Sequence, residues 1–317
     1  MRILVTGGAG YIGSTAAAML IDAGYEVNVL DDLSTGHSDS LSEEVNFING
    51  TLLSDSNLDT ALEGCQAVMH FAAKSLVGES VEKPELYEKV NVGGSKALFA
   101  KMKAHGISRI VLSSTAATYG EPKRVPITEN DEPAPKNPYG ATKLEIDRMV
   151  ANSGFSAISL RYFNVAGAYK GKNGWLAERH NPETHLIPRI LQNLNNFHIY
   201  GKDYSTPDGT CIRDYIHVDD VANAHIKAAG RLLTGKQCHT INLGTGKGYS
   251  VKEIVNLVEK ITGQRVKYEF MPRRDGDPDI LVADATIAKN ILYFQPKHDI
   301  ISMIETAYNW HLKNDEY

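Results

Sequence analysis

The sequence contains little cysteine and no long apolar run. Its 317 residues include 3 cysteines, Cys65, Cys211 and Cys238, without a paired spacing, so it predicts neither a disulfide framework nor a cysteine metal motif. An odd and sparse set of this kind is typical of a reducing compartment. No apolar segment approaches the length that crosses a membrane, and the first residues run into a strand without a signal peptide. We therefore expect a cytoplasmic protein.

An excess of basic charge is also missing. Asp and Glu number 38 against 33 for Lys and Arg, which gives a formal net charge of -5 and a pI near 6.1. This balance argues against the basic footprint of a general nucleic-acid-binding protein. The 11 histidines show no HExxH spacing, and we predict no structural metal. The length suits one large α/β domain and a smaller second one.

Short β-branched runs alternate with helical patterns through the first half of the chain. Arg2–Gly7 is such a run, and residues 12–24 follow it with helical spacing. Further strands are expected at residues 25–31, 66–73, 108–114 and 155–164, and further helices at 84–106 and 137–154. Strands that alternate with helices imply right-handed crossovers. The sequence therefore predicts an α/β fold with a doubly wound, Rossmann-type parallel sheet.

The pattern changes after about Asn164. Residues 167–185 are polar and loop-like, although no break in composition marks a linker. We expect a first domain at residues 1–166 and, mainly at residues 167–317, a second, smaller substrate-binding α/β domain. A segment near residues 215–240 is expected to return to the first domain.

A glycine-rich turn follows the first strand. The motif TGGAGYIG places Gly7, Gly10 and Gly13 before the first helix, where glycine lets the backbone approach a pyrophosphate at the helix N-terminus. Asp31 ends the second strand, at the spacing of a carboxylate that binds the adenosine ribose and repels a 2′-phosphate. Asp32 could share this role or lie in a solvated loop. The combination predicts a dinucleotide site that prefers NAD to NADP.

The heptad NPYGATK places Tyr139 and Lys143 one helical turn apart. Asn-Pro is typical of a helix start, so the two side chains share a face. A phenol of pKa about 10 is a poor base, but a nearby ammonium and a nicotinamide ring favour the phenolate. We predict that Tyr139 removes a proton from a sugar hydroxyl, that Lys143 lowers its pKa and binds the nicotinamide ribose, and that Thr115 donates to the same oxygen. A solvated pair and a strand-end hydroxyl are the alternatives.

Eight motifs extend this pattern nearly end to end: GGAGYIGS, DDLSTGH, HFAAKSLVGESVEKP, SSTAATYGE, NPYGATK, RYFNVAGA, DGTCIRDYIHVDD and PRRDGDP. Together they resemble the extended short-chain dehydrogenase/reductases, and specifically the UDP-glucose 4-epimerase family. The resemblance implies an isomerase that interconverts UDP-glucose and UDP-galactose. It implies that hydride leaves sugar C4 for tightly bound NAD and returns to the other face of a 4-keto intermediate, while Tyr139 acts as base and then acid. It also implies a homodimer through helices near residues 84–105 and 138–153.

The resemblance extends the assignment of residues to the two ligands. Those expected to bind NAD are Gly7, Gly10, Tyr11, Ile12, Gly13, Asp31, Asp32, Leu33, Ser34, Thr35, Gly36, Thr51, Leu52, Phe71, Ala72, Ala73, Lys74, Ser75, Tyr139, Lys143 and Phe163. Those expected to bind the UDP-sugar are Thr115, Tyr139, Asn164, His185, Leu186, Tyr200, Arg213, Arg274, Asp277 and Leu281. By chemistry alone, the arginines suit a diphosphate and Tyr200 offers a flat face to uracil.

Some positions depart from the family pattern. Thr15 stands where many relatives carry histidine, which we expect to be neutral. Thr51 replaces an aspartate that hydrogen-bonds the adenine amino group, and Val90 replaces an asparagine, so both could loosen NAD retention. Leu281 stands where a tyrosine tends to exclude N-acetylated sugars. We expect it either to admit UDP-GlcNAc and UDP-GalNAc or to be an ordinary core residue.

Two other functions fit parts of the pattern. A nucleotide-sugar 4,6-dehydratase of the same superfamily needs an acid pair beside the hydroxyl, but Ala116 and Ala117 follow Thr115. A non-catalytic NAD-sensing protein has no need of the intact Tyr139, Lys143 and Thr115. The sequence therefore favours the epimerase over both.

Overall fold

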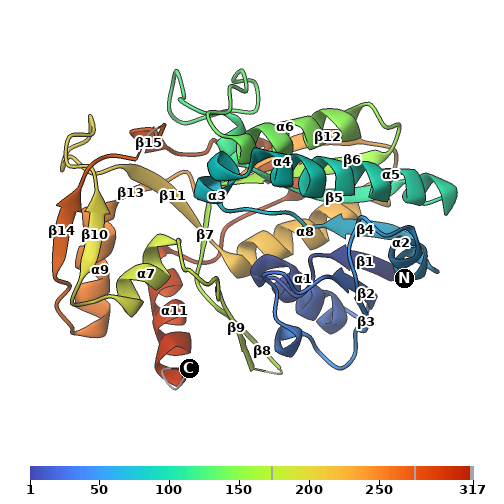
Figure 1. The fold of residues 1–317 in the computed structure, drawn as a ribbon, viewed down its shortest axis with the longest axis horizontal. Helices are drawn as coiled ribbons and strands as arrows, with labels where there is room; N and C mark the ends of the chain where they lie inside the picture. Colours follow the sequence, from blue (N-terminus) through green and yellow to red (C-terminus); the bar gives the residue numbers. More distant parts are fainter. Residues whose placement is uncertain (173, 275, 315–317) are drawn as a thin grey trace.

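The computed structural model describes residues 1–172, 174–274 and 276–314, and its largest element is a seven-stranded sheet (Figure 1). The strand order is β12-β6-β5-β4-β1-β2-β3, and every pairing is parallel. The strands are β1 (Arg2–Thr6), β2 (Glu26–Asp31), β3 (Asn46–Asn49), β4 (Ala67–His70), β5 (Arg109–Thr115), β6 (Ser156–Tyr162) and β12 (Cys238–Leu243). The predicted doubly wound, Rossmann-type fold is confirmed.

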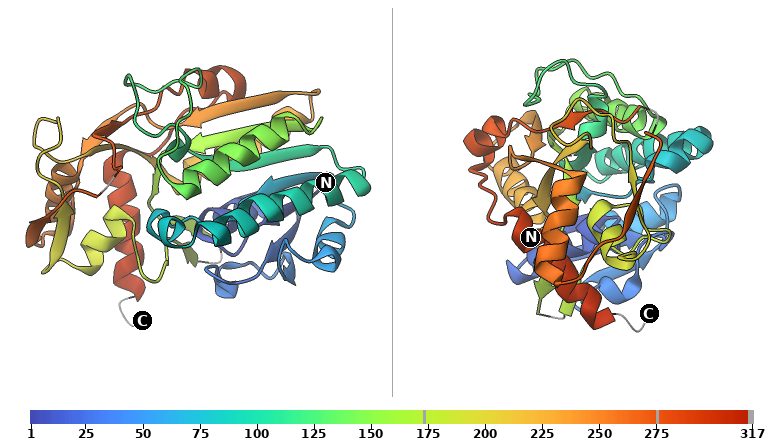
Figure 2. Two further views of the ribbon diagram at one scale, coloured as in Figure 1. Left: turned by 45° about the horizontal axis from the view of Figure 1, so that its top comes forward. Right: turned by 90° about the vertical axis from the view of Figure 1, so that its left-hand side faces the viewer.

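Helices bury both faces of this sheet (Figure 2). In β1, Ile3 and Val5 belong to the core on one face and Leu4 to the core on the other. Since successive strand residues point to opposite faces, burial on both sides explains why the strands read as continuous apolar runs. The first face is covered by α1 (Tyr11–Asp22), α8 (Val218–Leu232) and α10 (Thr286–Leu292), and the second by α2 (Asp55–Leu62), α5 (Gly94–Ala104) and α6 (Pro138–Ala151).

A second, smaller α/β unit lies beside the carboxyl ends of the large sheet (Figure 1). Its strand β11 (Ile212–His217) pairs with β7 (Asn164–Ala166), β13 (Gly248–Ser250) and β15 (Ile280–Leu281), while β10 (Phe197–Tyr200) pairs with β14 (Tyr268–Met271). A separate core lies among α7 (Leu186–Gln192), α9 (Val251–Thr262) and α11 (Ile300–Asn314). The hairpin β8 (Tyr169–Gly171) and β9 (Gly174–Leu176) precedes α7. In the chain, α8 and β12 come between elements of the smaller unit, but α8 packs on one face of the large sheet and β12 is an edge strand of that sheet. The predicted boundary at residue 166 stays a prediction.

The helix predicted at residues 84–106 has an irregular middle. It comprises α4 (Pro84–Tyr87), a π-helical turn (Glu88–Gly93) and α5, preceded by α3 (Val77–Glu82). A π-helical turn widens the helix by one residue and is frequent at functional sites. Within this turn, Asn91 exchanges hydrogen bonds with the backbone of Lys74, in the loop after β4. Such long-range bonds leave no trace in helical periodicity.

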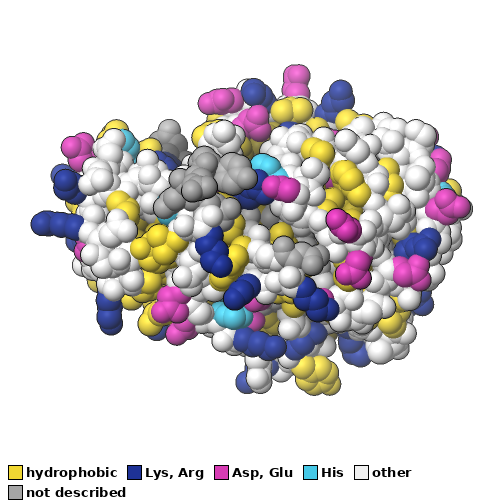
Figure 3. Space-filling view, turned by 90° about the horizontal axis from the view of Figure 1, so that it is seen from below, with side chains coloured by type: hydrophobic (Ala, Val, Ile, Leu, Met, Phe, Trp, Pro, Cys, Tyr) yellow, Lys and Arg dark blue, Asp and Glu magenta, His cyan; other side chains and the backbone are white. Residues whose placement is uncertain are grey.

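The surface shows no segregation of charge on the face seen in Figure 3, where acidic and basic side chains are interspersed. Within the described part of the chain, no helix combines the length and the apolar character that a membrane crossing requires. Cys65 and Cys211 are buried, Cys238 is exposed, and all three are free thiols.

Candidate active site

The glycine-rich turn between β1 and α1 forms a cradle with no room for side chains. Gly7 has a φ of 69°, and a Cβ on it would lie 2.5 Å from the backbone nitrogen of Ala72. A Cβ on Gly13 would lie 2.1 Å from the carbonyl oxygen of Gly7. Gly10 is the N-cap of α1 and provides no side-chain cap for its first amides. Uncapped amides at a helix N-terminus suit an anion, so the turn fits the pyrophosphate of a dinucleotide.

Asp31 lies at the end of β2, beside this turn. Its carboxylate accepts hydrogen bonds from the backbone N–H of Ala9 at 3.0 Å and of Leu33 at 2.8 Å. Burial raises the pKa of Asp31, and these two bonds oppose the shift by favouring the charged form. Each carboxylate oxygen keeps a further lone pair, so the side chain can accept from ribose hydroxyls. Asp32 is exposed and accepts from the backbone N–H of Ser34 at 3.0 Å.

A cavity of about 1140 Å³ runs from the glycine-rich turn to the second unit. All the residues predicted to bind NAD or the UDP-sugar line it except Leu33 and Gly36. Leu33 has a φ of 57° and shapes the turn after Asp31. Gly36 packs against Ala9, since a Cβ on it would lie 2.9 Å from the Ala9 carbonyl carbon. These two residues contribute backbone shape to the site rather than cavity surface.

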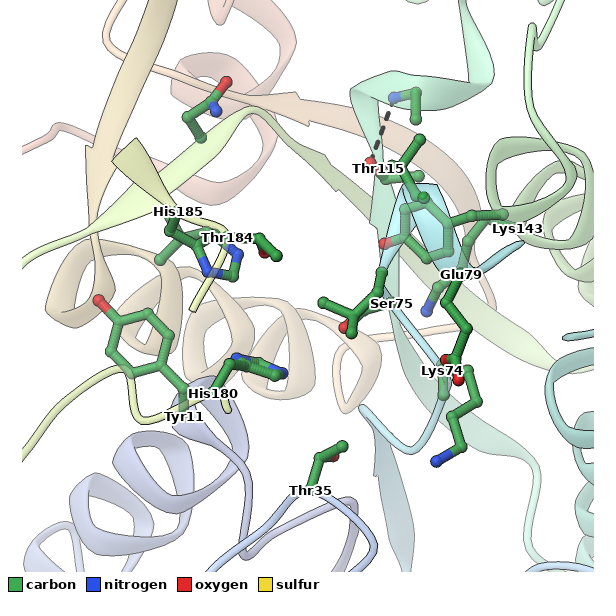
Figure 4. A pocket seen from close by; sticks show the side chains of 18 of the residues that line it. Tyr11, Thr35, Lys74, Ser75, Glu79, Thr115, Lys143, His180, Thr184 and His185 are labelled. Atoms are coloured by element: carbon green, nitrogen blue, oxygen red, sulfur yellow. Dashed lines mark hydrogen bonds between the residues drawn. The ribbon is translucent and has the colours of Figure 1, made fainter. Parts of the chain in front are cut away.

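The start of α6 sets the positions of Tyr139 and Lys143. The side chain of the N-cap, Asn137, accepts a hydrogen bond from the backbone N–H of Gly140 at 2.8 Å. Lys143 is only 4% exposed, and its Nζ donates to the carbonyl oxygen of Ser113 at 2.8 Å. The sequence spacing is therefore realised on a helix whose reactive side points into the cavity, as Figure 4 shows for Lys143.

Burial shifts both reactive groups towards their uncharged forms. It raises the pKa of Tyr139 to about 12, and a hydrogen bond with Thr115 opposes this shift. It lowers the pKa of Lys143 to about 8, and the charge of Asp147 opposes that shift. Thr115 also accepts from the backbone N–H of Ala117 at 3.2 Å (Figure 4). In the protein alone, therefore, Tyr139 is a neutral phenol near pH 7.

Asn91 connects the loop after β4 with α6, two parts of the chain that line the cavity, and sequence reasoning missed it. Its side-chain oxygen accepts from the backbone N–H of Lys74 at 2.7 Å, and its amide donates to the Lys74 carbonyl at 3.0 Å and to the Thr142 hydroxyl at 3.1 Å. It thereby fixes the loop after β4 against α6. The signal available in the sequence was a polar asparagine between two valines, just before Gly93 and Gly94. Val90, the residue before it, lines the cavity.

Glu178, His180, Glu183 and His185 form a charged cluster on the other side of the cavity, where Figure 4 labels its histidines. His180 is hydrogen-bonded to Glu178, and His185 Nδ1 lies 2.8 Å from Glu183 Oε1 and 3.5 Å from Glu178 Oε2. Although burial lowers the pKa of His185, the two carboxylates raise it to about 9. Only His185 was predicted. The other three lie in an irregular segment, where no periodicity indicates which residues meet.

Two groups of side chains have the composition of a metal site. Glu178, His180 and His185 offer ligand atoms within 4.8 Å of one another, and so do His217, Asp219 and His298. In the charged cluster, the two carboxylates are already hydrogen-bonded to the two imidazoles and raise the pKa values of both. The absence of a structural metal stays a prediction.

The predicted UDP-sugar residues of the second unit meet at the far end of the cavity. Arg213 is buried and forms an ion pair with Asp277. The guanidinium of Arg274 lies 4.2 Å from the ring centroid of Tyr200, so it covers one face of the ring predicted to contact uracil. Leu281 lies beside Arg213, as its partner in the pairing of β15 with β11. This end therefore combines two arginines, an aromatic ring and an aliphatic wall.

Comparison with known proteins shows which family the chain belongs to. Residues 3–244 match the model of the NAD dependent epimerase/dehydratase family. The chain is similar to the UDP-glucose 4-epimerase of Halalkalibacterium halodurans, with 48% identity over 98% of this chain and 96% of the relative. The solved UDP-glucose 4-epimerase from Brucella ovis in complex with NAD is 43% identical with a TM-score of 0.93, over 98% of both chains. The UDP-Glc/GlcNAc 4-epimerase from Campylobacter jejuni is 36% identical with a TM-score of 0.83, over 98% of this chain and 99% of that one. The chain therefore belongs to the NAD dependent epimerase/dehydratase family, within the branch of the UDP-glucose 4-epimerases.

Proposed function

We propose that this protein is an NAD-dependent UDP-hexose 4-epimerase that interconverts UDP-glucose and UDP-galactose. The observation that carries the proposal is one cavity that joins three predicted parts: the glycine cradle, the Tyr139–Lys143 pair and the two arginines of the second unit. Its relatives carry the same function in their names. The large sheet and the helices that cover it would hold the cofactor, and the smaller unit would hold the UDP-sugar.

Tyr139 performs the proton transfer in this proposal. Its phenolate removes the proton of the sugar 4-hydroxyl and the resulting phenol later returns it, while Thr115, hydrogen-bonded to Tyr139, donates to the same sugar oxygen. Bound NAD would supply the hydride acceptor for C4 and return the hydride to the opposite face. Because burial alone keeps the phenol protonated near pH 7, the ammonium of Lys143 is needed to favour the phenolate.

The residues of the second unit hold the part of the substrate that does not react. Arg213 and Arg274 neutralise the diphosphate, and Tyr200 contacts the uracil. Contacts remote from C4 keep the ligand bound while the hexose rotates within the cavity between the two hydride transfers. The protonated His185, held by Glu178 and Glu183, offers a charged N–H donor on this path.

Leu281 supports a wider substrate range. It is partly buried, lines the cavity and packs against a small apolar cluster that includes Tyr119 and Phe163. A leucine leaves more room than a tyrosine at this position. We infer that UDP-GlcNAc and UDP-GalNAc are also interconverted, as the name of the Campylobacter jejuni relative states for GlcNAc in that protein.

The two rival functions have less support. In the turn after β5, Ala116 and Ala117 occupy the positions where a dehydratase needs acids. A sensor would not need a proton donor and an ammonium buried on one helical face. Incubation of the purified protein with UDP-galactose, followed by NMR of the products, separates all three. UDP-glucose supports the epimerase, a dehydrated sugar supports the dehydratase, and unchanged UDP-galactose overturns both enzyme proposals.

We also propose a cytoplasmic homodimer. Its contact surface would be formed by α4 and α6, where a shallow groove is lined by Pro84, Glu88, Pro138, Ala141 and Glu145. Three free thiols accord with a reducing compartment. Light scattering of the purified protein tests the assembly, since a molar mass near 34.8 kDa, that of one chain, would contradict the dimer.

A further inference from the structure

An acidic residue continues the helical face that carries Tyr139 and Lys143. Asp147 lies four residues after Lys143 on α6, so the three side chains occupy successive turns of one face. Asp147 is only 6% exposed and does not line the cavity. It belongs to neither predicted ligand set. A carboxylate buried so deeply needs partners, because burial disfavours its charged form.

The partners of Asp147 come from two neighbouring strands. Its Oδ2 accepts from Ser114 Oγ on β5 at 3.0 Å and from Arg161 Nε on β6 at 3.0 Å, and Arg161 Nη2 lies 2.9 Å away. Its Oδ1 is buried without a hydrogen-bond partner among the described residues. Ser114 follows Ser113, whose carbonyl binds Lys143. Asp147 and Lys143 are therefore hydrogen-bonded to adjacent residues near the end of β5.

The other titratable groups around Lys143 are uncharged near pH 7 or already paired. Burial lowers the pKa of His70 on β4 to about 3 and that of His225 on α8 to about 4, and it raises those of Tyr139 on α6 and Tyr162 on β6. Arg161 on β6 is paired with Asp147, and Glu79 on α3 with Lys83. Among the described residues, Asp147 is the one anion found to oppose the effect of burial on Lys143.

We propose that Asp147 is a positioning residue of the reaction, whose carboxylate, held by Arg161 and Ser114, keeps the Lys143 ammonium charged beneath the substrate. Its catalytic consequence rests on the proposed function, because a charged Lys143 matters only if Tyr139 transfers a proton. The titration of the ammonium itself does not depend on that function. The two statements can therefore be tested apart.

The direct test is the titration of Lys143 in the Asp147→Asn variant. Asparagine keeps the size and an acceptor for Ser114 but removes the charge and leaves Arg161 uncompensated. The midpoint of Lys143 should fall by roughly one pH unit, the size of a charge interaction across one to two helical turns. NMR of protein labelled in its lysine side chains measures it, with Lys143→Arg assigning the signal. Glu79→Gln, which removes a paired anion that lines the cavity, is the matched control and should leave the midpoint unchanged.

The pH profile of activity connects this titration with the reaction. In Asp147→Asn, the alkaline limb of the kcat profile should move to lower pH by the same roughly one unit. Activity should then fall about fivefold near pH 8, approach a tenfold loss above about pH 9, and change little near pH 6. The double variant Asp147→Asn/Arg161→Gln removes both buried charges. In the double variant, the titration midpoint of Lys143 should lie between those of the wild type and the single variant. The double variant replaces the single one in this test if the single variant does not fold.

Three outcomes decide the matter. An unmoved Lys143 midpoint in a folded variant overturns the inference, and so does an equal loss of activity at every pH without a shift of the limb. A shifted midpoint together with a shifted limb supports it. A shifted midpoint in a protein that never converts UDP-galactose supports the electrostatic role of Asp147 and overturns the proposed function.

Discussion

The two walls of the cavity are built in different ways. One is a capped helix that presents Tyr139 and Lys143 at a fixed spacing, in surroundings that drive both groups towards their uncharged forms. The other is the irregular segment before α7, where hydrogen-bonded carboxylates raise the pKa values of His180 and His185. A group that exchanges protons needs a poised pKa, whereas a group that binds an anion needs a fixed charge. We therefore propose that the first wall carries out the chemistry and that the second binds the substrate.

The Tyr139→Phe variant is the largest test of this division. It lacks only the phenolic hydroxyl, and with it the group that accepts and returns the proton, so kcat for UDP-galactose should fall by roughly 10²–10⁴-fold while KM changes little. The NAD content of the purified protein should match that of the wild type. Product analysis by NMR measures the turnover. Near-normal turnover would remove Tyr139 from the role of acid and base.

The Asp31→Ala variant tests whether the two ligands depend on separate parts of the cavity. Loss of the carboxylate should weaken NAD by roughly 10-fold or more, because its hydrogen bonds to the ribose are charge-assisted. Discrimination against NADP should decrease as well, and KM for UDP-galactose at saturating NAD should stay unchanged.

Calorimetric titration of both dinucleotides measures the effect of this change. Glu43→Ala, at an exposed site outside the cavity, is the control and should bind NAD as the wild type does. NADP as the dominant nucleotide in the wild-type protein would contradict the assignment of Asp31.

The Glu178→Gln variant should give the opposite kinetic pattern to Tyr139→Phe. With one anion removed, the pKa of His185 should fall from about 9 towards its ordinary value. His185 would then be less protonated near pH 8, so its hydrogen bond to the diphosphate would no longer be charge-assisted, although the net charge of this wall changes little because an anion is removed as well. KM for UDP-galactose should rise several-fold to about 10-fold while kcat changes little. A fall in kcat with unchanged KM would place chemistry on both walls.

The same variant should alter the pH dependence of stability. Because the pKa of His185 is raised in the folded state, its stabilising contribution is complete below its ordinary value of 6.5 and is lost as the pH rises through about 9. The melting temperature of the wild type should therefore fall between pH 6.5 and 9.5 more than that of Glu178→Gln. Glu43→Gln, at an exposed site outside the cavity, should behave as the wild type does.

The Leu281→Tyr variant is expected to have the smallest effect on the main reaction. The added ring should exclude the acetamido group, so interconversion of UDP-GlcNAc and UDP-GalNAc falls while UDP-galactose is still converted. NMR of both reactions with one enzyme preparation compares them. If the wild type leaves UDP-GlcNAc unconverted at high enzyme concentration, Leu281 is an ordinary wall residue.

The sequence predicted what short-range physics controls. The strand and helix alternation, the glycine turn, Asp31 and the helical pair could all be read from local patterns, because each depends on residues within a few turns or one strand. The interruption at Asn91 and the strand β3 could not. The hydrogen bond that Asn91 accepts from the backbone N–H of Lys74, 17 residues earlier in the chain, is a property of the packed chain.

Local sequence by itself determined that Tyr139 and Lys143 share one helical face, and that the backbone before α1 can approach a pyrophosphate. Only the tertiary structure decided in which direction their pKa values shift. Burial beneath β5 lowers the pKa of Lys143, and the carboxylate that opposes this shift, Asp147, is paired with an arginine 14 residues further along the chain. The charged cluster likewise exists only because a loop folds four side chains together. Spacing along the chain is local, but electrostatic energy depends on every charge and every solvent-excluding atom that folding brings near.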